Sequence, residues 1–272
     1  YSWRSIQVAN AHLTSYNYQR NLDSHMMKNT EWGAVAYLQH SVYGSQESVR
    51  INNNNGYLTG YAAVNEPTTG YTATNISCST TPDGCNEYGT SESVTLPYNT
   101  STGYLASTTG NITGVYDMSG GAWEYMMGVM MDSSGNPMSG RNKSYNSGFL
   151  GTYGCPTCDS NDGTASNTTG KSWPDAKYYD LYTYQTSASS FKNRILGDAT
   201  GELGPFQSMT YGSQTRQINS WYDDEGWFVY PYNPWFARGG VYASGTGAGV
   251  FHFNNANGRA YSHHSFRVVL AV

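Results

Sequence analysis

Residues 116–125 read Y-D-M-S-G-G-A-W-E-Y, a short loop around two glycines with a carboxylate on either side, Asp117 and Glu124. Two later segments follow in order, W-F-A-R-G-G at 235–240 and S-F-R-V-V at 265–269. Each of these short motifs is weak evidence by itself. Their occurrence together, in this order and at this spacing, is fairly specific, so we take the three segments as the framework of the fold.

The three segments resemble the formylglycine-generating enzyme (sulfatase-modifying factor) domain, a variant of the C-type lectin fold. Its pattern is a G-N-V-W-E-W box, an R-G-G box and a terminal G-F-R box. Residues 29–38, N-T-E-W-G-A-V-A-Y-L, are similar to the N-terminal helix in a bacterial branch of this family. The resemblance implies an α+β fold with a small twisted antiparallel sheet, two helices and long irregular loops. It makes residues 21–272 one C-type lectin-like domain and residues 1–20 an N-terminal segment that could follow a lost anchor or assembly helix.

The residue patterns themselves also predict few helices and long loops. Residues 21–41 carry apolar side chains at helical spacing, and residues 188–196 form a second candidate helix that ends at Gly197, a typical C-terminal residue. Elsewhere, short apolar runs alternate with turns rich in Gly, Asn and Asp. Large aromatic side chains dominate core energetics. The aromatic cluster that we therefore expect in the core comprises Trp221, Trp227, Phe228, Trp235 and Phe236.

Composition excludes several classes of function. A length of 272 residues suits a single large domain. Only 12% of the residues are charged and the net charge is -5, so the chain lacks the basic field that binds nucleic acid. Its longest apolar runs are far shorter than the roughly 20 residues of a membrane span. Abundant Tyr, Trp, Gly, Ser and Asn are typical of recognition surfaces, and equally of loop-rich extracellular β proteins.

Four cysteines, Cys78, Cys85, Cys155 and Cys158, allow three disulfide pairings or a zinc site with four thiolates. We favour the two local pairings, because no Lys or Arg lies nearby to lower a thiol pKa for redox chemistry. An even number of cysteines weakly indicates a location outside the cytosol.

The family's oxidase activity requires cysteines after the R-G-G box, where they bind copper and perform the chemistry. Residues 241–265 contain no cysteine, so we expect no enzymatic activity and no catalytic cofactor. A related branch binds iron through three histidines. The adjacent His263 and His264 lack the spacing of such a site, and we expect them to be a surface pair.

The resemblance also implies a structural calcium at the W-E box. Carried over position by position, its ligands are the side chains of Asp117 and Glu124 and the carbonyls of Gly120 and Ala122. Oxygen ligands suit such a hard cation. The alternative is that Glu124 caps a backbone group or pairs with an arginine.

A second branch of the fold comprises the variable proteins of diversity-generating retroelements. There, the stretch between the R-G-G and F-R boxes is rewritten at Asn codons, which can never become Lys, Glu, Gln, Met or Trp. Residues 241–265 contain none of these five. The residues that we expect to form a displayed ligand-binding surface are Val241, Tyr242, Ser244, Thr246, His252, Asn254, Asn255, Asn257, Arg259, Tyr261, Ser262, His263 and His264.

The sequence therefore predicts a non-catalytic, extracellular ligand-binding domain, of the receptor-binding or adhesin type, on a cell or virion surface. Its partner would be a protein or glycan on another cell. The alternative is a self-assembling structural subunit of a pilus-like filament or phage spike. A formylglycine-generating oxidase is the third possibility, and the missing cysteines disfavour it.

Overall fold

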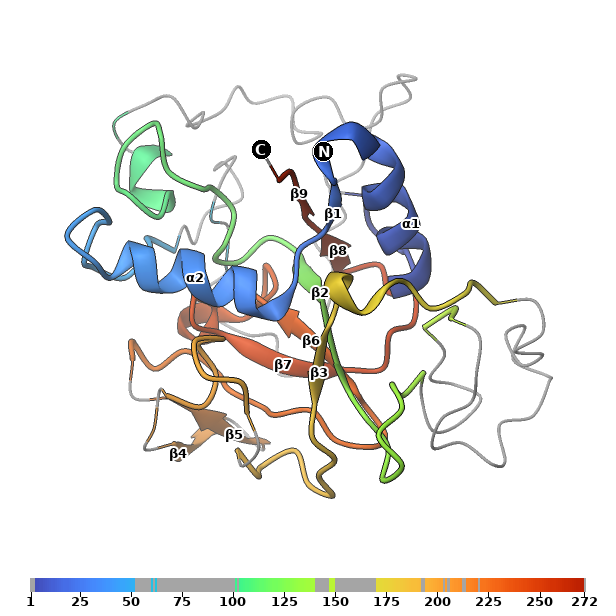
Figure 1. Ribbon diagram of the computed structural model, residues 1–272. Helices are drawn as coiled ribbons and strands as arrows, with labels where there is room; N and C mark the ends of the chain where they lie inside the picture. The colour runs from blue at the N-terminus through green and yellow to red at the C-terminus, as the bar shows by residue number, and fades with distance from the viewer. Residues whose placement is uncertain are drawn as a thin grey trace.

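The computed structural model describes residues 3–51, 60, 62, 101, 103–139, 147–149, 170–191, 194–202, 204, 206–211, 214–219 and 221–271. The cysteines of the expected disulfides, Cys78, Cys85, Cys155 and Cys158, lie outside these residues. The described chain has an α+β fold with two α-helices, small sheets and short 3-10 helices (Figure 1). None of its described helices is long and apolar enough to cross a membrane.

The main sheet is built around strand β2 (Trp123–Met130). Strand β6 (Trp235–Arg238) pairs with it antiparallel, and β7 (Phe253–Ala256) pairs antiparallel with β6. On the other edge of β2, β8 (His264–Phe266) and β3 (Asp180–Tyr182) both run parallel to it. The sheet is therefore mixed, which corrects the expected antiparallel sheet. Long connections lead from β2 to β3 and β8, and parallel pairing requires such connections.

Two smaller strand pairs lie beside the main sheet. β1 (His25–Met26) pairs antiparallel with β9 (Val268–Val269), so an early segment of the chain lies against the C-terminal strand. β4 (Gln207–Tyr211) and β5 (Gln214–Ile218) form an antiparallel hairpin. The described 3-10 helices are η1 (Arg20–Leu22), η3 (Gly103–Ala106), η5 (Ala176–Tyr178) and η6 (Gly245–Gly247).

One of the two expected helices forms and the other does not. Helix α2 (Asn29–Gln39) lies within the predicted range 21–41. The helix predicted at 188–196 is wrong, because the described residues there form turns and irregular backbone. The carbonyl of Ala188, which would accept from the next helical turn, instead accepts from the Phe228 N–H at 2.8 Å. The second helix of the described chain is α1 (Val8–Tyr18).

Helix α1 belongs to the packed structure, although the sequence placed residues 1–20 outside the domain. Its Val8, Ala9 and Ala11 are buried in one cluster with Tyr125 and Trp235 of the sheet. Residue 20 therefore does not separate an unpacked segment from the core. The helix escaped detection because it is rich in Asn, Ser, Thr and Tyr, which have weak helix propensity.

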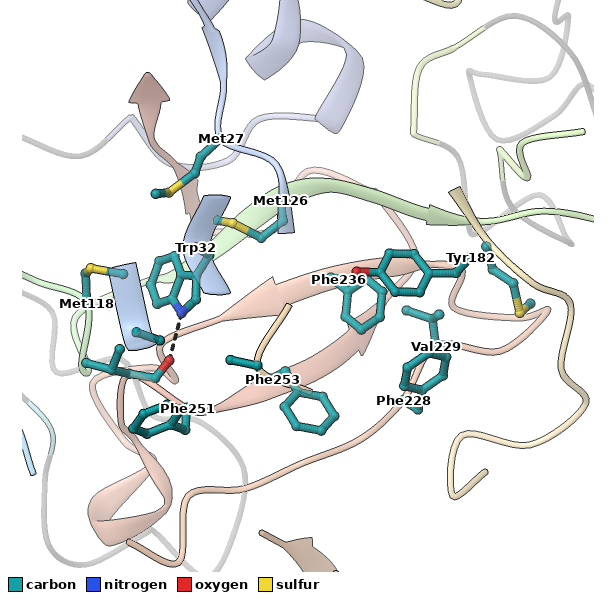
Figure 2. Close-up of a cluster of buried hydrophobic side chains, with 14 of the residues drawn as sticks. Met27, Trp32, Met118, Met126, Tyr182, Phe228, Val229, Phe236, Phe251 and Phe253 are labelled. Carbon is teal, nitrogen blue, oxygen red and sulfur yellow. Dashed lines mark hydrogen bonds between the residues drawn. The ribbon is translucent and has the colours of Figure 1, made fainter. Parts of the chain in front are cut away.

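The sheet is covered on both faces, which explains why β2 is apolar along most of its length. Successive side chains of a strand point to opposite faces. Met126 and Met130 therefore belong to the same buried cluster as Trp32 of α2, whereas Met127 and Val129 belong to the cluster that includes α1. Figure 2 shows Met126 beside Trp32. The expected aromatic core is confirmed for Phe228, Trp235 and Phe236, which are fully buried, whereas Trp221 and Trp227 are half-buried.

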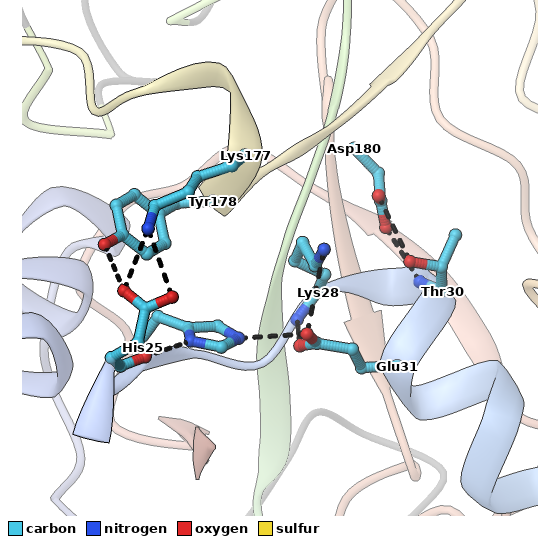
Figure 3. Close-up of polar contacts among 8 residues, drawn as sticks. His25, Lys28, Thr30, Glu31, Lys177, Tyr178 and Asp180 are labelled. Carbon is cyan, nitrogen blue, oxygen red and sulfur yellow. Dashed lines mark hydrogen bonds and ion pairs between the residues drawn. The ribbon is translucent and has the colours of Figure 1, made fainter. Parts of the chain in front are cut away.

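Carboxylates hold the N-terminus of α2 against its neighbours (Figure 3). Glu31 accepts from the Lys28 N–H at 2.8 Å and lies 2.9 Å from His25 Nε2 of β1. Asp180 of β3 accepts from the Thr30 N–H at 2.7 Å and from its hydroxyl at 3.2 Å. Negative charge is favourable at this end of a helix because of the helix dipole. These contacts fix α2 over the sheet, and Trp32 Nε1 then donates to the Val250 carbonyl at 2.7 Å (Figure 2).

Candidate ligand-binding face

The predicted binding stretch begins and ends at the Trp123 end of β2. It leaves β6 at Gly239 and Gly240, both of which have a positive φ of 81°. The Tyr242 N–H donates to the Gly121 carbonyl at 2.8 Å. The stretch then returns as β8, which pairs His264 with Trp123. Residues far apart in the sequence therefore meet around one half-buried tryptophan.

Five of the predicted ligand-binding residues do not present their side chains to solvent. The buried ones are Val241, Ser244, His252, Asn257 and His264. The remaining residues are half-buried or exposed, namely Tyr242, Thr246, Asn254, Asn255, Arg259, Tyr261, Ser262 and His263. This corrects the expectation of a continuous displayed stretch. The cause is local folding: Ser244, for example, turns inward because its hydroxyl accepts from the Val241 N–H at 3.0 Å.

His252 has a structural role beneath the face. Its Nε2 accepts from the indole Nε1–H of Trp123 at 3.2 Å, and its Nδ1 lies 2.8 Å from the Gly247 carbonyl. An indole N–H can only donate and a carbonyl can only accept, so this geometry assigns the neutral ring with its proton on Nδ1. His252 therefore links β2 to η6.

The two adjacent histidines differ in their surroundings, so the expected surface pair is wrong for one of them. His264 is only 3% exposed and lies between the rings of Tyr125, at 4.4 Å, and Trp123, at 5.1 Å. Burial lowers its pKa well below the usual value, so it is neutral at pH 7. His263 is half-buried, and its pKa is also lowered by burial.

Hydrogen bonds hold the loop before β8 in a defined shape. The buried Asn257 donates from Nδ2 to the Tyr261 hydroxyl at 2.6 Å and accepts from the Arg259 N–H at 3.1 Å. The Tyr125 hydroxyl donates to the Arg259 carbonyl at 2.8 Å. The Tyr261 ring stacks on His263 with centroids 5.4 Å apart and an interplanar angle of 21°. A fixed loop thus presents an aromatic pair at the surface.

The N-terminal segment completes this surface, which the sequence did not indicate. The Ser5 N–H donates to the Tyr261 carbonyl at 3.0 Å. Trp3 is 61% exposed, and its ring meets Phe266 edge-on at 6.4 Å. We call the surface formed by Trp3, Arg4, Arg259, Tyr261 and His263 the Tyr261 face. The only sequence signal for the N-terminal part of this face was a tryptophan near the start of the chain.

The two asparagines of β7 are engaged with neighbours instead of being free for a ligand. Asn254 donates to Glu225 Oε1 at 3.3 Å, and Asn255 accepts from Asn233 Nδ2 at 2.7 Å. They lie in the middle of β7, next to Ala237 and Phe236 of β6 in the register. The exposed Arg259 and the half-buried rings of Tyr261 and His263 lie on the Tyr261 face, whereas the half-buried Tyr242 of the predicted set lies outside it.

Glu124, one of the residues carried over for calcium, forms an ion pair with Arg267. Arg267 Nε donates to Glu124 Oε2 at 2.8 Å, and its Nη2 donates to Oε1. Asp117 Oδ1 accepts from the Gly60 N–H at 3.0 Å. Both oxygens of Glu124 are thus engaged, and a cation at Asp117, Gly120, Ala122 and Glu124 would have to displace Arg267. In this arrangement Glu124 fits an ion pair better than a cation site, and among the described residues no group of three or more His, Cys, Asp or Glu side chains is arranged to hold a metal ion.

No protein-family model matches the chain, and no curated protein sequence matches it. The function must therefore be argued from the arrangement of the residues themselves.

Proposed function

We propose that this chain is a non-catalytic, extracellular ligand-binding domain of the formylglycine-generating-enzyme-like C-type lectin fold, displayed on a cell or virion surface. The Tyr261 face, together with Tyr242 before η6 and Thr246 within η6, is its binding surface. The single observation that carries the proposal is the hydrogen-bonded loop 257–263, which presents Tyr261 and Arg259 on a fixed backbone.

The physical reason is that binding costs less when the binding loop is already ordered. Tyr, Trp and Arg are also the side chains that most often carry interface energy. The absence of cysteine after the R-G-G segment supports a non-catalytic role. The absence of Lys, Glu, Gln, Met and Trp from residues 241–265 supports diversification of this stretch by a retroelement.

The proposal is tested by screening the labelled chain on an array of glycans and purified extracellular proteins. We expect the wild type to bind a subset of the array and Tyr261→Ala to lose that binding. Tyr43→Ala is the matched control, because Tyr43 is 80% exposed and lies on the loop after α2. Equal binding by wild type and Tyr261→Ala would contradict the proposal.

A further inference from the structure

We propose that the ligand of the Tyr261 face is a carboxylate-bearing sugar, such as a sialic or uronic acid. This inference rests on the proposed function and adds the chemical class of the ligand. It is carried by the charge of the C-terminal region, the geometry of Arg259 over Tyr261, and a second arginine from the N-terminal segment.

The charge of the region is the first observation. The last acidic residue of the chain is Glu225, and residues 226–272 contain three arginines and no Asp or Glu. The chain as a whole has a net charge of -5, so this region is opposite in sign to the rest. A cationic region in an acidic protein attracts anionic ligands and discriminates against neutral ones.

Two of the three arginines are occupied inside the fold. Arg238 is fully buried and donates to the side-chain oxygen of Asn29 and to the carbonyls of Asp198 and Ala199, at 3.1 to 3.2 Å. Arg267 is held by Glu124. Arg259, by contrast, is exposed, and its guanidinium carbon lies 5.8 Å from the centroid of the Tyr261 ring. It is the arginine of this region that a ligand can reach.

A second arginine is carried by a segment that is distant in the sequence but contacts this loop through its backbone. The bond between the Ser5 N–H and the Tyr261 carbonyl brings the exposed Arg4 to the loop that carries Arg259. A guanidinium matches the two oxygens of a carboxylate with two parallel hydrogen bonds. The two arginines, one on each of the two segments that this backbone bond joins, therefore favour an anionic group on the ligand.

The aromatic rings supply the other half of the recognition. Tyr261 and His263 lie nearly parallel, and Asn257 fixes the Tyr261 hydroxyl. A sugar ring has an apolar C–H face that stacks on such a ring, while its carboxylate reaches the adjacent guanidinium. Burial keeps His263 neutral at pH 7, so the positive charge of the face comes from the arginines.

The chain also contains a matched control. Arg20 lies over Tyr16 with its guanidinium carbon 5.0 Å from the ring centroid, so the same Arg-over-Tyr arrangement occurs at the end of α1. There, however, both Nε and Nη2 of Arg20 donate to Asn17 Oδ1, which leaves less of the guanidinium for a ligand. Arg20→Ala removes an exposed arginine of similar setting without touching the Tyr261 face.

The experiment measures the affinity of the full chain for free N-acetylneuraminic acid and glucuronic acid, with galactose and glucose as the neutral counterparts. Titration followed by protein NMR suits the weak binding expected of monosaccharides. We expect the acidic sugars to bind about tenfold or more tightly than the neutral ones, with the difference shrinking at high salt. Arg259→Ala should remove this preference, Arg259→Lys should retain part of it, and Arg20→Ala should leave it intact.

The outcomes separate this inference from the function on which it rests. Equal binding of acidic and neutral sugars, lost in Tyr261→Ala, would overturn the acidic-sugar inference and leave a binding face. Binding of a poly-glutamate peptide but of no sugar would overturn it as well. If Tyr261→Ala and Arg259→Ala both leave every interaction of the wild type unchanged, the face itself is wrong.

Discussion

Arg267 donates to both carboxylate oxygens of the buried Glu124, and this contact joins two of the three motifs that frame the fold. The third motif supplies Arg238, whose guanidinium binds Asn29 of α2 and the carbonyls of residues 198 and 199. Glu124, Arg238 and Arg267 thus connect different elements of the fold. The proposed ligand binding is assigned to residues outside these motifs.

The Glu124–Arg267 pair should contribute substantially to stability. Glu124→Gln leaves a mostly buried guanidinium without its carboxylate, and removing one partner of such a pair is strongly destabilising. We expect a loss of about 2 kcal/mol or more in the free energy of unfolding, measured by urea denaturation. Glu47→Gln, at an exposed glutamate, is the control and should change stability by less than about 0.5 kcal/mol. A Glu124→Gln variant as stable as the wild type would show that the pair is not formed.

A calcium ion at Asp117 and Glu124 would make the melting temperature depend on a chelator. A cation that binds only the folded state raises its melting temperature, so a chelator would lower it. The ion pair with Arg267 leads us to expect no change in melting temperature when EDTA is added. If the chelator lowers the melting temperature of the wild type but not of Glu124→Ala, the result would support a calcium site and contradict the ion-pair interpretation.

His25 should make stability depend on pH. Its Nδ1 lies 2.7 Å from the Asp23 carbonyl and its Nε2 lies 2.9 Å from Glu31, so both nitrogens face acceptors and the ring is doubly protonated (Figure 3). The hydrogen bond to Glu31 is the main cause that raises the pKa of His25 above its usual value. Two charged pairs surround His25. Glu31 also contacts Lys28, and Asp23 contacts Lys177 and accepts from the Tyr178 hydroxyl.

A raised histidine pKa stabilises the fold fully below the unfolded pKa and loses this contribution as the pH rises through the folded pKa. The melting temperature of wild type relative to His25→Gln should therefore fall between about pH 6.5 and the higher pKa of His25 in the fold. His12 acts in the opposite sense, because burial lowers its pKa to about 4, and it is present in both proteins. A difference in melting temperature that does not vary with pH would contradict the protonated His25.

Gly128 should not tolerate a side chain. A Cβ at this position of β2 would lie 2.9 Å from the Asn29 Cβ and 3.1 Å from the Phe236 ring, so the glycine lets the start of α2 approach the sheet. Gly128→Ala should lower the free energy of unfolding by about 1–3 kcal/mol, as overpacking of cores does. Gly135→Ala is the comparison for backbone strain without crowding. An added Cβ would meet open space there, but the backbone has a positive φ of 85°. If Gly128→Ala is neutral, the contact between α2 and the sheet is looser than described.

The sequence predicted the elements whose pattern is local. The helical spacing within 21–41 located α2, and the aromatic cluster correctly placed Phe228, Trp235 and Phe236 in the core. Helix α1 was missed because its buried residues are mainly small and its helix propensity is weak. The helix expected at 188–196 failed because the Ala188 carbonyl found a tertiary donor in Phe228.

The candidate site was predictable only in outline. Its stretch of chain could be chosen from the framing motifs, but the burial of His264 depends on a contact with Tyr125, which is far away in the sequence. The inward turn of Ser244 comes from a local hydrogen bond with Val241 that the residue pattern did not indicate. The contribution of Trp3 and Arg4 depends on long-range contacts, among them the backbone bond between Ser5 and Tyr261 and the ring contact between Trp3 and Phe266, which no pattern in the sequence encodes.

The central claim is that the Tyr261 face and Tyr242 bind the ligand. The most direct test is the dissociation constant for the tightest glycan or protein found on the array, measured for wild type and for the Tyr242→Ala, Tyr261→Ala double variant. We predict a loss of about 2 kcal/mol or more in binding free energy, with Tyr43→Ala unchanged and with folding of the double variant retained by circular dichroism. A folded double variant that binds as tightly as the wild type would contradict the central claim.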